Sequence, residues 1–116
     1  MYQLHYADIQ QDAVLDAKTR EREIIGRSIA LLEAASDPSA SRFAVVEATH
    51  FTQRVWSAFL NDLAQDDNQL PGELKASLIS IGIWVLKENE RIRQNESSDF
   101  EGIIDVSRTI LNGINA

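Results

Sequence analysis

The sequence contains no cysteine and few prolines, glycines or aromatic residues. A cysteine count of zero excludes disulfide bonds, thiolate metal sites and thiol catalysis. The two prolines and five glycines fall mostly where helices are expected to begin or end, which favours long helices. Residues 78–86 form the longest nearly apolar run, and it is far shorter than the roughly 20 residues that cross a bilayer. We therefore expect no membrane insertion.

Positive charge is also scarce. Lys and Arg number 11 against 18 Asp and Glu, and the net charge is −7. Phosphate backbones and anionic membrane surfaces repel an acidic chain, so we expect no direct contact with nucleic acid. Residues 1–8 lack the basic start and the continuous apolar stretch of a secretory signal. These residues are therefore not expected to be a secretory signal.

The apolar residues recur at helical spacing along most of the 116 residues. We predict an all-α fold, a four-helix antiparallel bundle with a short N-terminal arm. The arm covers residues 1–9 and is expected to be extended, and residues 10–116 form a single helical-bundle domain. The predicted helices span residues 12–35, 41–65, 71–94 and 98–113.

Local signals place the ends of these helices. Pro38 disfavours helical backbone at Asp37, and Pro71 is favourable in a first turn. Ser98 and Glu101 fit the S-x-x-E capping box, in which two free backbone amides are bonded reciprocally. Gly113 is the expected stop. The predicted buried residues are Leu31, Leu78, Ile81, Val85, Ile103 and Ile110.

The groups that catalysis requires are missing. The sequence has two histidines, His5 on the arm and His50 on the polar side of the second helix, and no phosphate-binding loop or nucleophile motif. Glu47 and His50 resemble half of a carboxylate–histidine metal motif, but a surface pair is the simpler interpretation. We predict no enzyme activity, no catalytic residue, no metal and no cofactor.

A surplus of apolar side chains remains. The third helix carries two apolar strips, which either bury in the core of the bundle or leave one strip for a partner. Large aromatic residues at the border of a core either cover it or anchor a partner. The candidate partner-binding residues are Tyr2, Leu4, Tyr6, Trp56, Phe59, Ile83 and Trp84.

The segment at residues 68–85, which reads NQLPGELKASLISIGIWV, resembles the hallmark stretch of the FlaF family of bacterial flagellar biosynthesis regulators. The similarity extends over nearly the whole chain, and its specificity lies in the combination of segments. Further matching positions are Tyr2, Tyr6-Ala7, Glu21-Arg22-Glu23, residues 28–32, Trp56, Asp62-Leu63, residues 90–92, Asp99-Phe100, residues 103–106 and Gly113.

This resemblance implies a cytoplasmic protein that is needed for flagellin production and export. It implies two partners, flagellin and an FlbT-like regulator of flagellin translation, and a role as a flagellin secretion chaperone. Two alternatives stay open: an adaptor that acts only through the FlbT-like partner, and a direct RNA-binding translational regulator. The sequence leaves the oligomeric state unknown.

Overall fold

The computed structural model describes the backbone of residues 2–115 and the side chains of residues 19–113. The chain forms four helices in the order α1 (Tyr2–Ala35), α2 (Arg42–Leu63), α3 (Gly72–Arg93) and α4 (Glu101–Asn115), and residues 2–115 include no strand. The predicted all-α class is confirmed. Residues 77–86, which also resemble a buried strand, are helical.

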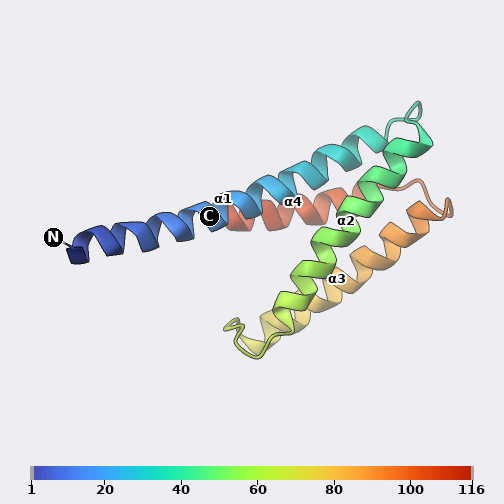
Figure 1. The fold of residues 1–116 in the computed structure, drawn as a ribbon. Coiled ribbons are helices and arrows are strands. Elements are labelled where there is room, and N and C mark those ends of the chain that lie inside the picture. Colours follow the sequence, from blue (N-terminus) through green and yellow to red (C-terminus); the bar gives the residue numbers. More distant parts are fainter. Residues whose placement is uncertain (1, 116) are drawn as a thin grey trace.

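Successive helices run in opposite directions and form a ring (Figure 1). Helix α2 packs on α1 and on α3, α4 packs on α1, and contacts between α3 and α4 are the sparsest of the four. The α2–α3 hairpin diverges from α1 and α4 toward its own loop (Figure 1). The bundle is therefore closed at the end where the α1–α2 and α3–α4 loops lie, and open at the other.

Helix α1 differs most from its prediction. It begins at Tyr2, so the backbone of the expected extended arm is part of the helix. No proline or glycine separates residues 2–9 from the amphipathic segment that follows, and without a breaker the helix continues. The side chains of residues 1–18 lie outside the described residues. The division into an arm and a domain stays a prediction.

Four of the predicted helix ends, namely the end of α1, the start of α2 and both ends of α3, lie within one residue of their expected places. Helix α1 ends at Ala35, and Ser41 caps α2 by accepting a hydrogen bond from the amide of Ala44 at 3.1 Å. Asn95 ends α3 in the left-handed region with a φ of 67°. The amide of Glu96 donates to the carbonyl of Arg91 at 2.8 Å, as in a Schellman motif.

The start of α4 corrects the capping prediction. The carboxylate of Asp99, rather than the hydroxyl of Ser98, accepts from the amide of Glu101 at 3.1 Å. The hydroxyl of Ser97 accepts from the amide of Asp99 at 3.1 Å, which orients that carboxylate. An aspartate and a serine compete for this position, and the anion is the stronger acceptor at a helix start. Gly113 does not end α4, which continues to Asn115.

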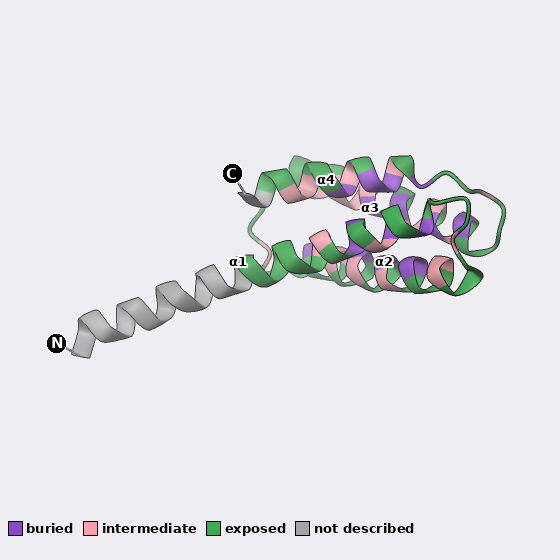
Figure 2. Cartoon of the chain, turned by 90° about the horizontal axis from the view of Figure 1, so that it is seen from above, coloured by how far each residue is buried: buried purple, intermediate pink, exposed green. Residues whose placement is uncertain are grey.

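The core lies where the four helices meet (Figure 2). Of the residues predicted to be buried, Val85 and Ile103 are buried, and the other four are only half-buried. Three of those four, Leu31, Ile81 and Ile110, pack against the core. Leu78, Ile81 and Ile110 lie toward the open end, where the hairpin diverges, whereas Leu31 lies near the closed end. The buried apolar residues are Ile29, Leu32, Ala35, Ala48, Trp56, Leu63, Val85, Ile92, Phe100, Ile103 and Ile104.

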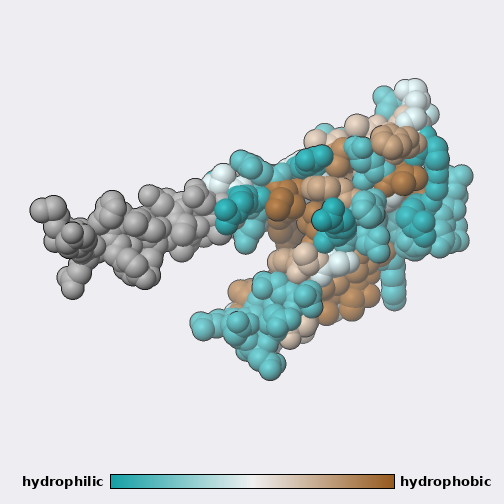
Figure 3. All heavy atoms as spheres, in the orientation of Figure 1, coloured by the Kyte–Doolittle hydropathy of each residue, from teal (hydrophilic) through white to brown (hydrophobic). Residues whose placement is uncertain are grey.

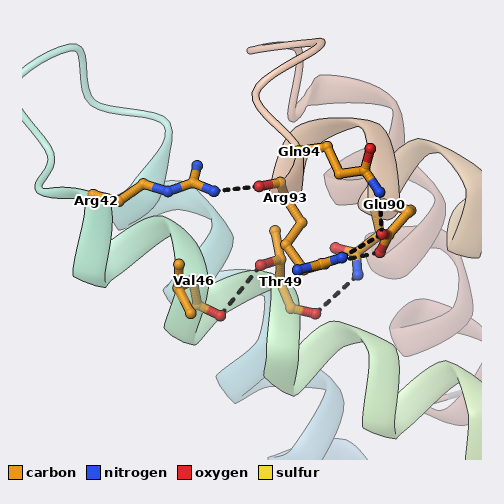
Figure 4. Close-up of polar contacts among 7 residues, drawn as sticks. Arg42, Val46, Thr49, Glu90, Arg93 and Gln94 are labelled. Carbon is orange, nitrogen blue, oxygen red and sulfur yellow. Dashed lines mark hydrogen bonds and ion pairs between the residues drawn. The ribbon is translucent and has the colours of Figure 1, made fainter.

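The closed end is fixed by a bond between helix ends (Figure 4). The guanidinium of Arg42, at the start of α2, donates to the backbone carbonyl of Arg93, at the end of α3. Cations are favourable at a helix C-terminus, where the last carbonyls lack partners within the helix. This contact ties α2 to α3 at the end where the loops gather, while the opposite end stays open.

Candidate functional site

Seven large apolar side chains among the described residues are exposed, and three of them lie on α3: Leu74, Ile83 and Trp84, at 45%, 44% and 43%. The others are Ile24 on α1, Phe43 and Val46 on α2, and Leu70 in the α2–α3 loop, and Phe43 is the most exposed at 74%. Hydrophobic residues gather along the α2–α3 hairpin and in the angle between this hairpin and α1, whereas the α2–α3 loop is hydrophilic (Figure 3). Apolar surface that is gathered in one place is typical of an interaction site.

A hollow of about 400 Å³ lies between α3 and α4. Its lining consists of Ser80, Ile81 and Trp84 from α3 and Val106 from α4. We call these four residues the α3–α4 hollow. Its walls are almost entirely apolar, and one of its sides is a large aromatic ring that is open to solvent. An apolar side chain from another molecule would lose contact with water there, which is the main source of affinity in helix-in-groove binding.

The spacing of residues along both helices builds the hollow. Positions three and four apart lie on one helix face, so Ser80, Ile81 and Trp84 form one strip of α3. On α4 the same spacing places Gly102 one turn before Val106. A Cβ at position 102 would lie 2.6 Å from Cη2 of Trp84. The glycine therefore lets the indole ring lie against the backbone of α4.

The predicted partner-binding residues are not gathered at one place. Trp56 is only 4% exposed and belongs to the core, and Phe59 packs against it with ring centroids 5.7 Å apart and planes at 87°. Trp84 and Ile83 are exposed, but only Trp84 lines the hollow. The side chains of Tyr2, Leu4 and Tyr6 lie outside the described residues.

Sequence reasoning missed the contribution of α4. Val106 and Gly102 follow the capping segment of an otherwise ordinary amphipathic helix, and nothing in their local pattern indicates a surface role. The usable signal is the small residue at position 102, because a glycine inside a helix costs about 0.5–1 kcal/mol relative to alanine and is retained where another group approaches closely. That signal does not identify Trp84 as the approaching group.

A metal-binding cluster is not found in the part of the chain that the structure describes. Among residues 19–113 no group of three or more His, Asp or Glu side chains is arranged to hold a metal ion, and both Glu47 and His50 are exposed. A second hollow of about 290 Å³ lies at the closed end between the loops. Asp37 lies there, and its pKa is lowered because the hydroxyl and amide of Ser39 donate to its carboxylate.

The family model described as Flagellar protein FlaF matches residues 2–114. This chain belongs to the FlaF family. The resemblance seen at residues 68–85 and at the scattered positions outside them is thereby confirmed, and it makes the chain a flagellar protein. The α3 strip of the hollow lies within residues 68–85, so the segment whose resemblance was noted in the sequence also carries the exposed tryptophan of this FlaF chain.

Comparison with curated proteins gives no match, and comparison with solved structures gives none either. Within the described part of this FlaF protein, none of the helices combines the length and the hydropathy needed to cross a bilayer.

Proposed function

We propose that this FlaF protein binds flagellin in the cytoplasm as a secretion chaperone and couples flagellin occupancy to the control of flagellin translation. It acts without enzyme activity and without a cofactor. The observation that supports the proposal is the α3–α4 hollow, in which Trp84 is 43% exposed and borders an apolar depression of about 400 Å³. Such a depression suits the apolar face of an amphipathic helix.

Flagellin is the partner proposed here because the chain is a flagellar protein and its hollow is apolar. A flagellin subunit that awaits export has amphipathic segments that are not yet packed against other subunits. Binding in the hollow would cover the apolar face of one such segment and prevent its premature assembly. Trp84 is the expected anchor, since tryptophan at the centre of an interface is among the residues that contribute most to affinity.

Titration of purified flagellin against wild-type protein and two variants tests the proposal. Trp84→Ala is expected to weaken flagellin binding about tenfold or more, as truncation of a hot-spot residue does. Ile83→Ala is the matched control, because Ile83 is on the same helix and equally exposed at 44%, but outside the hollow. Circular dichroism monitors folding. Equal affinities for all three proteins would exclude the hollow as the binding site.

The two alternatives make different predictions. An adaptor that acts only through an FlbT-like partner would not bind purified flagellin, so co-purification with flagellin alone and with the FlbT-like regulator alone separates the two. Direct RNA binding would weaken steeply as salt is added, because counterions are released from the phosphates. The net charge of −7 does not favour that mode, and apolar binding of flagellin would change little with salt.

A further inference from the structure

Five polar side chains among the described residues are buried in the bundle, and four of them, one from each helix, have a side-chain atom without a hydrogen-bond partner there. The four are Ser28 on α1, Thr52 on α2, Asn89 on α3 and Ser107 on α4, with exposures of 1%, 0%, 2% and 1%. We call these four residues the polar set. They lie among the buried aliphatic and aromatic residues that otherwise make up the core.

One side-chain oxygen of each residue in the polar set lacks a hydrogen-bond partner within residues 19–113. The hydroxyls of Ser28, Thr52 and Ser107 and the side-chain oxygen of Asn89 have no hydrogen-bond partner within the described residues. Thr49 provides a contrast, since its hydroxyl donates to the carbonyl of Val45 at 2.8 Å. A polar atom that leaves water without gaining a partner destabilises the packed state relative to an apolar side chain of the same shape. The packed bundle is therefore less stable than a bundle of the same shape with apolar side chains at these positions.

The seam between α3 and α4 has the sparsest contacts in the bundle, and Trp84 lies against Gly102 there. The α2–α3 hairpin already diverges from α4 toward its loop (Figure 1). By contrast, α2 and α3 are tied by Arg42 and by the amide of Asn89, which donates to the carbonyl of Thr49 at 2.8 Å.

We propose that the polar set lowers the cost of parting α3 from α4, so that one amphipathic helix of a partner enters the seam. Parting would widen the α3–α4 hollow and uncover Val85 and Ile103, which are 0% and 1% exposed in the closed bundle. The entering helix replaces the lost contacts on both walls. The identity of that partner as flagellin rests on the proposed function, whereas the opening itself does not.

The first experiment measures the opening without a partner. Ser28→Ala, Thr52→Val and Ser107→Ala are combined in one full-length chain, and Asn89 is kept because its amide is bonded. We expect the melting temperature to rise by roughly 5 °C or more, and hydrogen exchange in α3 and α4 to slow at least tenfold. Thr52→Val alone, the closest match in shape, is expected to act in the same direction with a smaller effect.

Gly26→Ala is the control for stability. A Cβ at position 26 meets open space, and alanine stabilises a helix interior relative to glycine. This variant is expected to slow exchange in all four helices to a similar extent. If removing the polar atoms left the melting temperature unchanged or lower, or slowed exchange as evenly as Gly26→Ala does, the inference would be wrong.

The second experiment measures binding of purified flagellin. The triple variant is expected to bind at least tenfold more weakly than wild type, and Gly26→Ala within twofold of wild type. Unchanged affinity in the triple variant would overturn the inference. Failure of the wild-type protein to bind flagellin would overturn the proposed function. Whether the α3–α4 seam opens would then be decided by the hydrogen-exchange measurements of the first experiment.

Discussion

The indole of Trp84 on α3 lies directly against Gly102 on α4, where a Cβ would come within 2.6 Å of Cη2 and 3.3 Å of Cζ2. The contact joins the two helices whose mutual packing is the sparsest. It also sets the position of the aromatic side of the α3–α4 hollow. A single small residue on α4 thus determines how far the ring of Trp84 stands out into solvent.

Gly102→Ala is therefore expected to move Trp84 rather than to unfold the protein. The ring tip yields because it is partly exposed, and the gain in helix propensity of about 0.5–1 kcal/mol offsets much of the strain. Tryptophan emission, recorded with Trp56→Phe as background so that only Trp84 reports, should shift to the red. Gly113→Ala is the matched control on α4, since a Cβ there meets open space. An unshifted spectrum in Gly102→Ala would contradict this account.

Gly82→Ala should have a different effect. A Cβ at position 82 would lie 2.6 Å from Cδ2 and 2.9 Å from Cγ of Leu60, inside the packed α2–α3 contact. Overpacking at such a site costs about 1–3 kcal/mol, and chemical denaturation should show a loss of that size. Leu60→Ala in the same chain should recover part of it. Additive losses in the double variant would mean that the two residues do not compete for space.

These glycines also show what could be predicted of the fold from sequence. The type of each helix and the approximate spans of α2, α3 and α4 follow from the recurrence of apolar residues, and the breakers at Pro38 and Pro71 place two ends. The start of α1 does not follow from it. The divergence of the hairpin does not follow from periodicity. It depends on where two helices approach closely, as Gly82 does with Leu60, and on where they do not. Periodicity alone predicts Leu78 and Ile81 as buried, but both are half-buried because they lie on the part of the hairpin that diverges.

The start of α4 gives a test of capping. Asp99 accepts from the amide of Glu101 at 3.1 Å, so Asp99→Ala is expected to cost about 1 kcal/mol. Ser98 is exposed and is not the capping residue, so Ser98→Ala should change the free energy of unfolding by less than about 0.5 kcal/mol. Urea denaturation of both variants measures the difference. The reverse order of the two effects would restore the capping box at Ser98.

Glu90 gives the chain a defined acid sensitivity. Hydrogen bonds from Arg93, at 2.5 and 2.9 Å, and from Gln94, at 2.8 Å (Figure 4), lower its pKa from 4.5 to about 2. The folded state thus holds the charged form more firmly than the unfolded chain. This contribution is complete above about pH 4.5 and is lost as the pH falls toward 2.

Glu90→Gln should therefore lower the melting temperature at pH 6, by a small amount because the group is exposed. The difference from wild type should shrink as the pH is lowered from 4.5 toward 2. Melting curves at pH 6, 4 and 2.5 measure it, and Glu47→Gln, an exposed glutamate on α2, is the control. A difference that stayed constant with pH would mean that the charge of Glu90 contributes nothing.

The candidate site was predictable only in part. Trp84 could be chosen from the sequence because large aromatic residues at the border of a core either cover it or anchor a partner. Trp56 has the same residue type but is 4% exposed. The difference arises from packing, since Phe59 contacts the Trp56 ring edge to face within the core. Whether Trp56 or Trp84 faces solvent depends on how the neighbouring helices pack. The pattern of apolar residues within a single helix does not show this.

Because α4 is the last helix to be synthesised and closes the ring, the chain folds during synthesis without it. Among the described residues, helices adjacent in sequence form three of the four contacting pairs, and the fourth pair, α1 and α4, joins distant segments. Local pairs form early and at low entropic cost. A nascent chain would hence assemble α1, α2 and α3 while one face of α1 stays uncovered. That face is shielded only after α4 has left the ribosome, so the unfinished chain passes through a stage prone to aggregation.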